Sequence, residues 1–530
     1  MDITSGDTFS TINKNDSQKR AEEDDSEIDH LTHLPDPILF LILSFLPFKQ
    51  WILMRLVSKT FKNLWTHAPV LDFQAPKSRF TGHMTCHCCG AFHGHVLPVE
   101  CYFYYIELPR ERFCRFVSRT LVEHSGYTIK VFRLALNYHH HSWGESMLKR
   151  WVDFMFTKDI ENLDVNFDES NSFEYHESTG LRVMQVNTSY LYFLPPQNFI
   201  SKMLSAMSLQ YCQFSTSGFG TFESLKYLCL RNVVLLDNQI TNFLSKFPMM
   251  LSLVVEKCVF GEDFFVSNEV LTIKYLYIFD CMTSTWLTYN VDVITPQIME
   301  FHFKGVGLQE FHIRNANELQ SVQIDIDCAD ASQEAGVRLS SLLNSLHHCA
   351  KLVLSSWCIQ VLSRWRSGSE YLLQFHSVRN LELILNFVKE EFPGIYYLLQ
   401  CCSNLKTLTI SIDMFNLPES VIPPELWPEI YDFPENNFWE THDSAVTCLQ
   451  YSVNTVTIYG FSGRAVEVEF LKFLLRNGQA LEKIYIQEFK GEQGDSVSDE
   501  WWVSNVAHIY NNRIANAVQF ASTSVQVIIK

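Results

Sequence analysis

Residues 225–230 read LKYLCL, and this L-x-x-L-x-L pattern decides the fold because it recurs along most of the chain. Copies with Leu, Ile or Val at the same three places are IENLDV at 160–165, IKYLYI at 273–278, LQSVQI at 319–324, VRNLEL at 378–383, LKTLTI at 405–410 and LEKIYI at 481–486. Starts at 225, 251 and 273 are 26 and 22 residues apart, and starts at 378 and 405 are 27 apart. The alternation predicts short strands, and the spacing predicts an array of repeats.

The spacing of about 20–29 residues is typical of leucine-rich repeats. Helical pattern lies between the strands, for example over residues 239–247, 340–347 and 395–402. Because each repeat buries its apolar face only against its neighbours, the array must stack into a curved α/β solenoid. We expect parallel strands on its concave side and short helices on its convex side. A compact α/β domain is the alternative, and it requires longer helices than these connections allow.

The stacked strands are expected to share one core. Their second apolar positions, read from the repeats, are predicted to point into it. These positions are 163, 228, 276, 322, 381, 408, 457 and 484.

A helical module precedes the repeats, over residues 34–65. Asp36 is predicted to cap a first helix that has Pro37 in its first turn. An apolar face follows at helical spacing, and Pro47 ends the segment. The face consists of Ile38, Leu39, Ile42, Leu43 and Leu46. A second helical stretch has apolar Ile52, Leu56, Phe61 and Trp65. Two short helices cannot bury this much apolar surface between them, so we expect a partner to cover the rest.

The module resembles an F-box. The resemblance rests on Leu34-Pro35-Asp36, the Ile38/Leu39/Ile42/Leu43 face, Leu46-Pro47, Val57-Ser58-Lys59 and Leu64-Trp65. Departures are Trp51, Thr60 and Phe61, and none removes the apolar face. The resemblance implies docking on the Skp adaptor of an SCF ubiquitin ligase. The adaptor-binding residues would be Leu34, Pro35, Ile38, Leu39, Ile42, Leu43, Leu46, Val57, Ser58 and Trp65. A helical hairpin that packs only on its own protein is the alternative.

Beyond the module, the chain resembles plant F-box/leucine-rich-repeat proteins of the FBD-containing type. The segments that carry this resemblance are FESLKYL at 222–228, FPMML at 247–251, PGI at 393–395, NLKTL at 404–408, NFW at 437–439, VTIYGFSG at 456–463, EFLKFLLRN at 469–477 and LEKI at 481–484.

The sequence pattern predicts seven segments along the chain. They are a disordered lead-in at 1–28, the F-box at 29–73, a Cys/His-containing connector at 74–100, leucine-rich repeats at 101–412, a Pro-rich irregular insert at 413–445, FBD-like terminal repeats at 446–490, and a C-terminal helix with a capping strand at 491–530.

Composition excludes several classes of protein. Lys and Arg number 41 against 59 Asp and Glu, and the net charge of −18 argues against a broad nucleic-acid surface. No apolar run reaches the roughly 18 residues of a membrane-spanning helix. The polar, acidic N-terminus does not resemble a signal peptide. We therefore expect a protein of the cytoplasm or nucleus whose 15 cysteines are reduced.

One cluster has metal-ligand chemistry: Cys86, Cys88, Cys89, His93 and His95. Thiolates and imidazoles bind Zn²⁺, but adjacent ligands and a gap of three residues between Cys89 and His93 crowd the site. We therefore expect a reduced connector and no metal. The sequence contains no nucleophile elbow, phosphate loop or dinucleotide fingerprint. It predicts no catalytic site and no cofactor.

These observations favour a non-catalytic, substrate-recognition subunit of an SCF-type ligase. Its F-box would bind the Skp adaptor, and through it the cullin and RING subunits, while the repeats bind a target protein for ubiquitination. A receptor F-box protein whose concave side binds a small molecule is the alternative. Affinity capture with and without a ligand would separate the two. The sequence does not identify the target.

Overall fold

The structure is a computed structural model that describes residues 34–57, 61–75, 108–126, 128–138, 145–167, 173–178, 181–186, 188, 191–195, 199–235, 240–261, 263–267, 272–283, 290–306, 311–327, 333–365, 374–412, 438–441, 446–488 and 525–529. The chain forms two compact units, residues 1–68 and 69–530. The lead-in at 1–28, nearly all of the connector, residues 413–437 of the Pro-rich insert and the C-terminal helix predicted before 525 lie outside the described residues.

The first unit is helical. Its elements are α1 (Asp36–Leu43), α2 (Phe48–Met54), α3 (Phe61–Leu64) and the 3-10 helix η1 (Trp65–His67).

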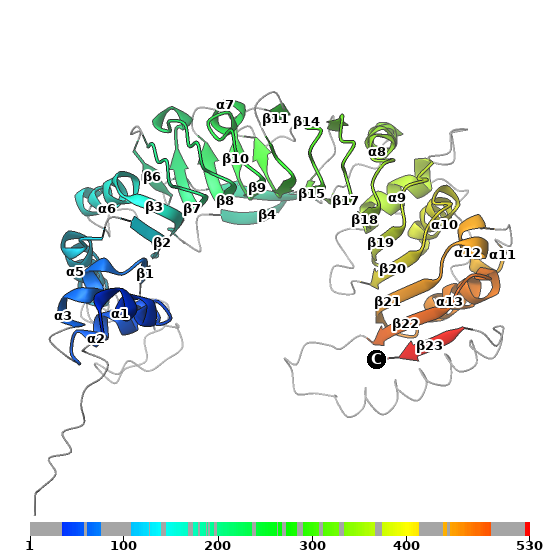
Figure 1. Ribbon diagram of the computed structural model, residues 1–530. Helices are drawn as coiled ribbons and strands as arrows, with labels where there is room; N and C mark the ends of the chain where they lie inside the picture. Colours follow the sequence, from blue (N-terminus) through cyan, green and yellow to red (C-terminus); the bar gives the residue numbers. More distant parts are fainter. Residues whose placement is uncertain are drawn as a thin grey trace, which may run out of the picture. The chain divides into compact units, whose positions relative to one another are not determined.

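The second unit is built on one long parallel sheet, which confirms the predicted α/β solenoid class (Figure 1). Each strand pairs with the next along the stack. In spatial order they are β1 (Val70–Gln74), β2 (Thr128–Ala135), β3 (Asp159–Asn166), β7 (Ala206–Phe214), β8 (Tyr227–Leu235), β9 (Ser252–Glu256), β12 (Tyr275–Phe279), β15 (Glu300–Val306), β17 (Ser321–Asp327), β18 (Lys351–Ser355), β19 (Asn380–Leu385), β20 (Thr407–Ile412), β21 (Thr455–Phe461), β22 (Lys483–Glu488) and β23 (Gln526–Ile529). Short strands β6 (Tyr192–Leu194), β10 (Val259–Phe260) and β13 (Met282–Thr283) join the same sheet.

The stack begins earlier than the repeat pattern indicates. Residues 70–73, taken in the sequence as the end of the helical module, belong to β1, which pairs with β2. The Pro-rich insert likewise contains a helix, α11 (Phe438–Thr441). The region described as FBD-like contains β21, α13 (Ala465–Asn477) and β22, in the order strand, helix, strand.

An apolar ladder runs through the stack at one register position. Its members face the same core because side chains alternate between the two sides of a strand. The ladder is Leu71, Phe132, Leu163, Met207, Leu228, Leu253, Leu276, Phe301, Val322, Leu352, Leu381, Leu408, Val456, Ile484 and Val527. Seven of the eight predicted positions lie on it; at 457 the prediction is wrong, because Val456 is fully buried and Thr457 is not.

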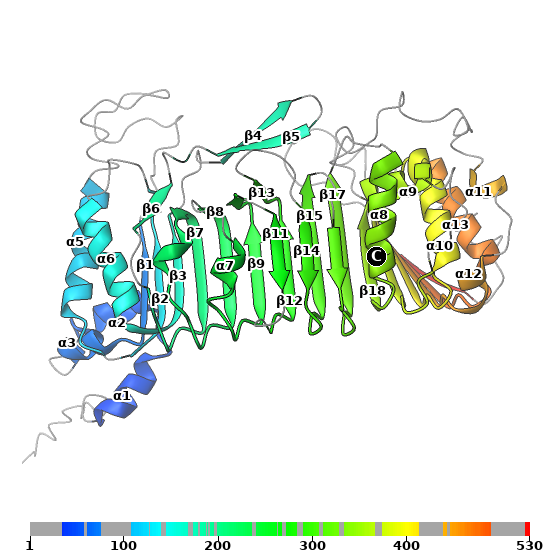
Figure 2. The same ribbon diagram turned by 90° about the horizontal axis from the view of Figure 1, so that it is seen from above.

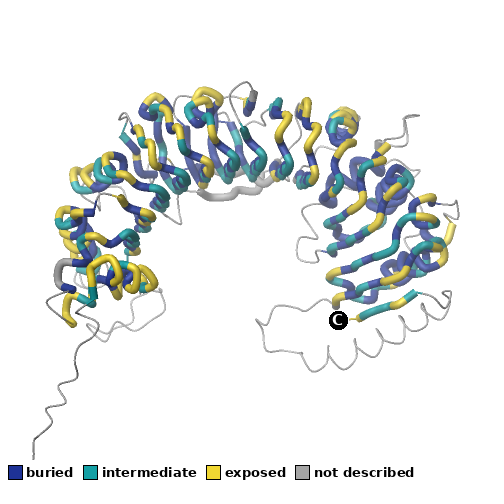
Figure 3. Tube along the Cα trace, in the orientation of Figure 1, coloured by how far each residue is buried: buried dark blue, intermediate teal, exposed yellow. Residues whose placement is uncertain are grey.

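The residues directly before and after each ladder residue in its strand point to the other side of the sheet, away from the core. We call the surface that they form the open face. Figure 1 shows the sheet on the inner side of the second unit's curve and the helices on the outer side. Buried and partly exposed residues accordingly alternate along each strand (Figure 3).

The outer side changes character along the stack (Figure 2). Helices α5 (Leu108–Glu123) and α6 (Glu145–Thr157) cover its first repeats, and α8 (Gln333–Ser345), α9 (Ser356–Trp365), α10 (Phe392–Cys401), α12 (Thr447–Tyr451) and α13 cover its last ones. The middle has instead the short helix α7 (Ile240–Leu244) and a second parallel sheet of β11 (Phe264–Ser267), β14 (Val291–Ile294) and β16 (Phe311–Arg314).

Repeat length explains this difference. Strand starts at 252, 275, 300 and 321 are 23, 25 and 21 residues apart, and these repeats return through a short strand. Starts at 321, 351, 380 and 407 are 30, 29 and 27 apart, and those repeats contain helices of 10 to 13 residues. Since a helix advances only about 1.5 Å per residue and a strand about 3.3 Å, the shorter repeats must return extended.

One insertion interrupts the repeats between β3 and β7. It contains an antiparallel hairpin of β4 (Phe173–Ser178) and β5 (Leu181–Val186). Val186 and Leu191 pack with Val234 and Val259 in a small separate cluster, which attaches the insertion to the ends of neighbouring strands.

None of the ten cysteines of the described residues forms a disulfide bond. Cys258 and Cys281 occupy the same place in consecutive repeats, each directly after a residue with positive φ (Lys257 and Asp280). Their thiols donate to carbonyl oxygens of the preceding repeat, Leu230 O at 3.4 Å and Val255 O at 3.6 Å. Burial raises the pKa of the Cys281 thiol well above its usual value, so it remains a protonated donor.

No helix in the described parts of the chain has both the length and the apolarity needed to cross a bilayer.

Two buried glutamates hold the strand-to-helix turns of the last repeats. Glu391 accepts hydrogen bonds from the backbone N–H of Asn386 (3.1 Å) and Val388 (3.0 Å) before α10. Glu467, in the first turn of α13, does the same for the N–H groups of Ser462 and Arg464, which precede that helix. The Arg464 guanidinium also lies 2.7 Å from Glu467. The side chain that donates to Glu391 is instead the neutral Ser356 hydroxyl.

Glu391 is expected to make stability depend on pH. Burial raises its pKa to about 7, and the hydrogen bonds from Ser356, Val388 and Asn386 only partly offset this. The folded state therefore binds the proton more tightly than the unfolded state. Its stabilising contribution is complete below the ordinary glutamate pKa and is lost as pH rises through 7. We expect Glu391→Gln to flatten the fall in melting temperature between pH 5 and pH 8, measured by calorimetry.

Glu467→Gln is the matched control, because it removes an equally buried carboxylate that has an arginine against it. An unchanged pH dependence in the Glu391→Gln protein would contradict the assignment.

Candidate functional site

Helix α1 begins one residue earlier than the sequence suggests. Pro35 is its N-cap residue, and Asp36 is its first helical residue, without a side-chain cap hydrogen bond. The prediction that Asp36 caps the helix is therefore wrong. Its carboxylate still lies in the first turn, where the positive end of the helix dipole favours negative charge. At the other end, the Ser44 hydroxyl donates to Leu41 O at 2.6 Å.

The first unit has its own apolar core, contributed by every helix. Leu39 and Leu43 of α1 are 0% and 2% exposed, and Trp51 of α2 is 3% exposed. The ring of Phe40 stacks with that of Trp51 at a centroid distance of 6.3 Å. The remaining buried apolar residues are Phe48, Phe61, Leu64, Trp65 and Ala68.

Large apolar side chains remain exposed around this core. On α1 and just beyond it they are spaced at i, i+3, i+4 and i+7, and so share one helix face. A second group lies in the last turn of α2 and just after it. The two groups are Ile38, Leu41, Ile42 and Phe45, and Leu53, Leu56 and Val57, with exposed fractions between 39% and 81%. Such a concentration on so small a unit is typical of an interaction surface. We call it the apolar surface.

The structure separates the ten predicted adaptor-binding residues into four groups. Exposed are Pro35, Ile38, Ile42 and Val57; partly exposed are Leu34 and Leu46; buried are Leu39, Leu43 and Trp65; Ser58 lies outside the described residues. The predicted helix face was too wide. One edge of it, at Leu39 and Leu43, turns into the unit's own core, and the other edge, at Ile38 and Ile42, faces outward.

Four exposed apolar residues were not among the predicted ones: Leu41, Phe45, Leu53 and Leu56. Leu41 and Phe45 lie three and seven positions after Ile38, so the helical period itself contained the signal. Phe45 is the most exposed large apolar residue of this unit, at 81%.

The second unit offers the open face of its sheet as a second candidate surface. A hollow of about 440 Å³ lies on it over β2 to β9. Small side chains from neighbouring strands, among them Ala206, Ser208 and Ser252, form its floor, and Tyr227 and Arg133 also line it.

The predicted metal candidates Cys86, Cys88, Cys89, His93 and His95 lie outside the described residues. Within the described ranges, no group of three His, Cys, Asp or Glu residues is arranged to hold a metal ion.

We expect the purified protein to contain no stoichiometric zinc, because the ligand spacing at 86–95 is too crowded for a tetrahedral site. Elemental analysis of the full chain measures this directly. One zinc per chain that disappears in a Cys86→Ser variant would contradict the expectation.

Comparison with known families gives two matches. Residues 31–72 match the F-box domain. Residues 120–529 match the family described as At1g61320/AtMIF1, LRR domain.

Several Arabidopsis thaliana proteins are similar over nearly their whole length. The putative F-box protein At3g29830 is 24% identical over 469 residues, 86% of this chain and 91% of the relative. The putative F-box/LRR-repeat protein At5g54820 is 23% identical over 481 residues, 87% and 91% of the two chains. The F-box/FBD/LRR-repeat protein At1g78750 is 21% identical over 478 residues, 86% and 89%.

Proposed function

Because this chain belongs to the plant F-box/leucine-rich-repeat family, we propose that it is the substrate-recognition subunit of an SCF-type ubiquitin ligase. The F-box binds a Skp-type adaptor, and the repeats bind a target protein. The observation that carries the proposal is the apolar surface of the first unit: it coincides with the F-box match and contains seven large apolar side chains that the unit leaves exposed.

This function is one of positioning. The chain itself makes and breaks no bond. By holding the target close to the ubiquitin-conjugating enzyme that the ligase recruits, it raises the effective concentration of a target lysine at the reactive thioester.

Helix α1 supports the adaptor role in its geometry. An amphipathic helix that buries one edge in its own unit and presents Ile38, Leu41, Ile42 and Phe45 on another suits recognition by a groove on a partner. Burial of their exposed parts would favour the complex, since full burial of one such side chain contributes about 1.5–3 kcal/mol.

Calorimetric titration of the full chain with a purified plant Skp adaptor tests the proposal. We expect stoichiometric binding with a negative heat-capacity change, because apolar area is buried. The absence of binding would reject the adaptor role. Affinity capture of targets with and without added small-molecule extract then distinguishes direct target recognition from the receptor alternative.

A further inference from the structure

Aromatic rings gather on the open face in the middle of the stack. Tyr227 of β8 is 53% exposed, and Tyr275 and Tyr277 of β12 are partly exposed. The rings of Tyr277 and His302 of β15 meet edge-on at a centroid distance of 4.9 Å. Tyrosine provides a large contact area at low entropic cost and is enriched in the energetic centres of interfaces.

The tyrosines are separated by a small residue. Tyr227, Ser252 and Tyr275 are register partners on three consecutive strands. Since neighbouring strands lie about 4.8 Å apart, the two rings start about 10 Å apart with only a serine between them. This leaves room for one extended or flat side chain of a partner. The hollow over β2 to β9 opens beside it, with Tyr227 and Ser252 in its lining.

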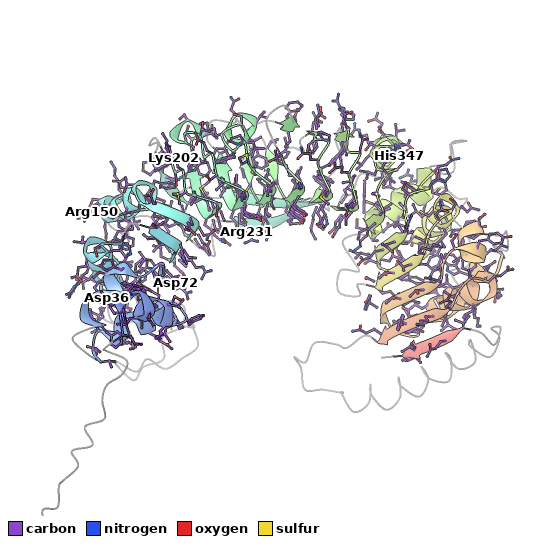
Figure 4. The ribbon with its side chains drawn as sticks, in the orientation of Figure 1. Asp36, Asp72, Arg150, Lys202, Arg231 and His347 are labelled. Atoms are coloured by element: carbon purple, nitrogen blue, oxygen red, sulfur yellow. The ribbon has the colours of Figure 1, made fainter. Side chains whose placement is uncertain are left out.

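Charges on the same face are mostly matched across strands. The open-face rows lie one residue before, one residue after and three residues after each ladder residue. From β1 to β17 they contain three Lys or Arg residues, each with an acidic neighbour on an adjacent strand. The pairs are Arg133–Asp72 at 3.9 Å, Arg231–Glu256 at 2.8 Å and Lys304–Asp325 at 3.1 Å. Figure 4 shows Asp72 and Arg231 on the inner side of the curve.

One acid of these rows, Glu300 of β15, forms no ion pair with a Lys or Arg among the described residues. Asp164 of β3, by contrast, lies across from Arg133 in register and interacts electrostatically with Arg231. Glu300 is the register partner of Tyr275 and accepts a hydrogen bond of 2.9 Å from the Tyr277 hydroxyl. Burial, followed by this hydrogen bond, raises the pKa of Tyr277 to about 12, so the phenol stays a donor. A carboxylate beside two tyrosine rings is the arrangement that attracts an organic cation.

We propose that this part of the open face binds an extended segment of the target through a basic side chain, lysine or arginine. Its aliphatic stem packs on the ring of Tyr275, and its cation contacts Glu300 on the next strand. The inference rests on the proposed function and names the chemistry of the target. The chain's net charge of −18 attracts the same partners over longer range.

The test is selection from a display library of random 14-residue peptides against the full chain in complex with its Skp adaptor. We expect enrichment of peptides that contain Lys or Arg. Glu300→Gln is expected to weaken the selected peptides at least tenfold, and Tyr227→Ala with Tyr275→Ala to do the same. Glu334→Gln is the matched control: it makes the same charge change on α8, where the carboxylate is 81% exposed, and should leave peptide affinity unchanged.

Each result has a defined meaning. Selected peptides without basic residues, peptides that bind Glu300→Gln as tightly as the parent, or selection of no peptide would each overturn the inference. Adaptor titration on the same variants keeps the two proposals apart. Basic-peptide binding in a chain that does not bind the adaptor would support this inference and reject the ligase role.

Discussion

A Leu408→Asp variant is expected to lose the folded repeats around β20. Leu408 is fully buried and lies on the apolar ladder between Leu381 and Val456. A carboxylate there has no hydrogen-bonding partner, and the loss of burial adds to its cost, on the order of several kcal/mol. Because each repeat is stabilised only by its neighbours, the damage should spread to adjacent repeats. Circular dichroism and limited proteolysis measure the effect.

Thr409→Asp is the control for this prediction, since Thr409 is one residue further along the same strand and points to the open face. It should unfold close to the parent temperature. Leu228→Asp should reproduce the effect of Leu408→Asp in the first half of the array. If both ladder variants unfold at the parent temperature, the register of the stack is incorrect.

The second large effect is expected at the apolar surface. Replacement of Ile38 and Ile42 by Asp should weaken Skp-adaptor binding at least a hundredfold while the first unit stays folded. Both side chains are exposed, at 44% and 39%, so solvent can hydrate the new carboxylates in the free protein. In the complex they would be buried without partners. Calorimetric titration gives the affinity, and near-ultraviolet circular dichroism reports on the tryptophan environment.

Leu39→Ala with Leu43→Ala provides the contrast. Those two side chains fill the core of the first unit, and their truncation should cost about 2–5 kcal/mol each. Adaptor binding should then fall because the unit unfolds, with a loss of the Trp51 and Trp65 signal. Parent-like affinity in the Ile38/Ile42 variant would remove the apolar surface from the adaptor interface.

Period and spacing were sufficient to predict the solenoid. The strand pattern at 225–230, repeated at intervals of 22 to 27 residues, defines a parallel stack, because no other arrangement buries the face of each repeat. The error at 457 arose because three β-branched residues follow one another, with Thr457 between the apolar Val456 and Ile458. A shift of one residue in the assignment exchanges the two sides of a strand. The three-stranded sheet on the outer side was not predicted. Its strands β11, β14 and β16 are only four residues long, too short for their alternation to be recognised in the sequence.

The candidate site was predicted at the level of the segment and not of the side chain. Apolar spacing predicted a helix with an apolar face between Asp36 and Pro47, but it does not distinguish the edge that is buried in the unit from the edge that faces out. That choice depends on where α2 and η1 lie, which is tertiary information. The open-face carboxylates are likewise ordinary strand residues in the sequence. Only the register shows that Arg133, Arg231 and Lys304 each lie beside an acidic residue, whereas Glu300 lies beside Tyr275.

The dependence of the outer side on repeat length has a consequence for how such proteins diverge. Gain or loss of about six residues in one connection would exchange an outer helix for an outer strand and leave the inner strand in place, since closing a slightly longer loop costs little free energy. Relatives can therefore accumulate insertions and deletions on the outer side while the inner strands, and the side chains that they present, keep their positions. Alignment gaps among relatives should then concentrate between strands, and the spacing of open-face residues should be preserved strand by strand.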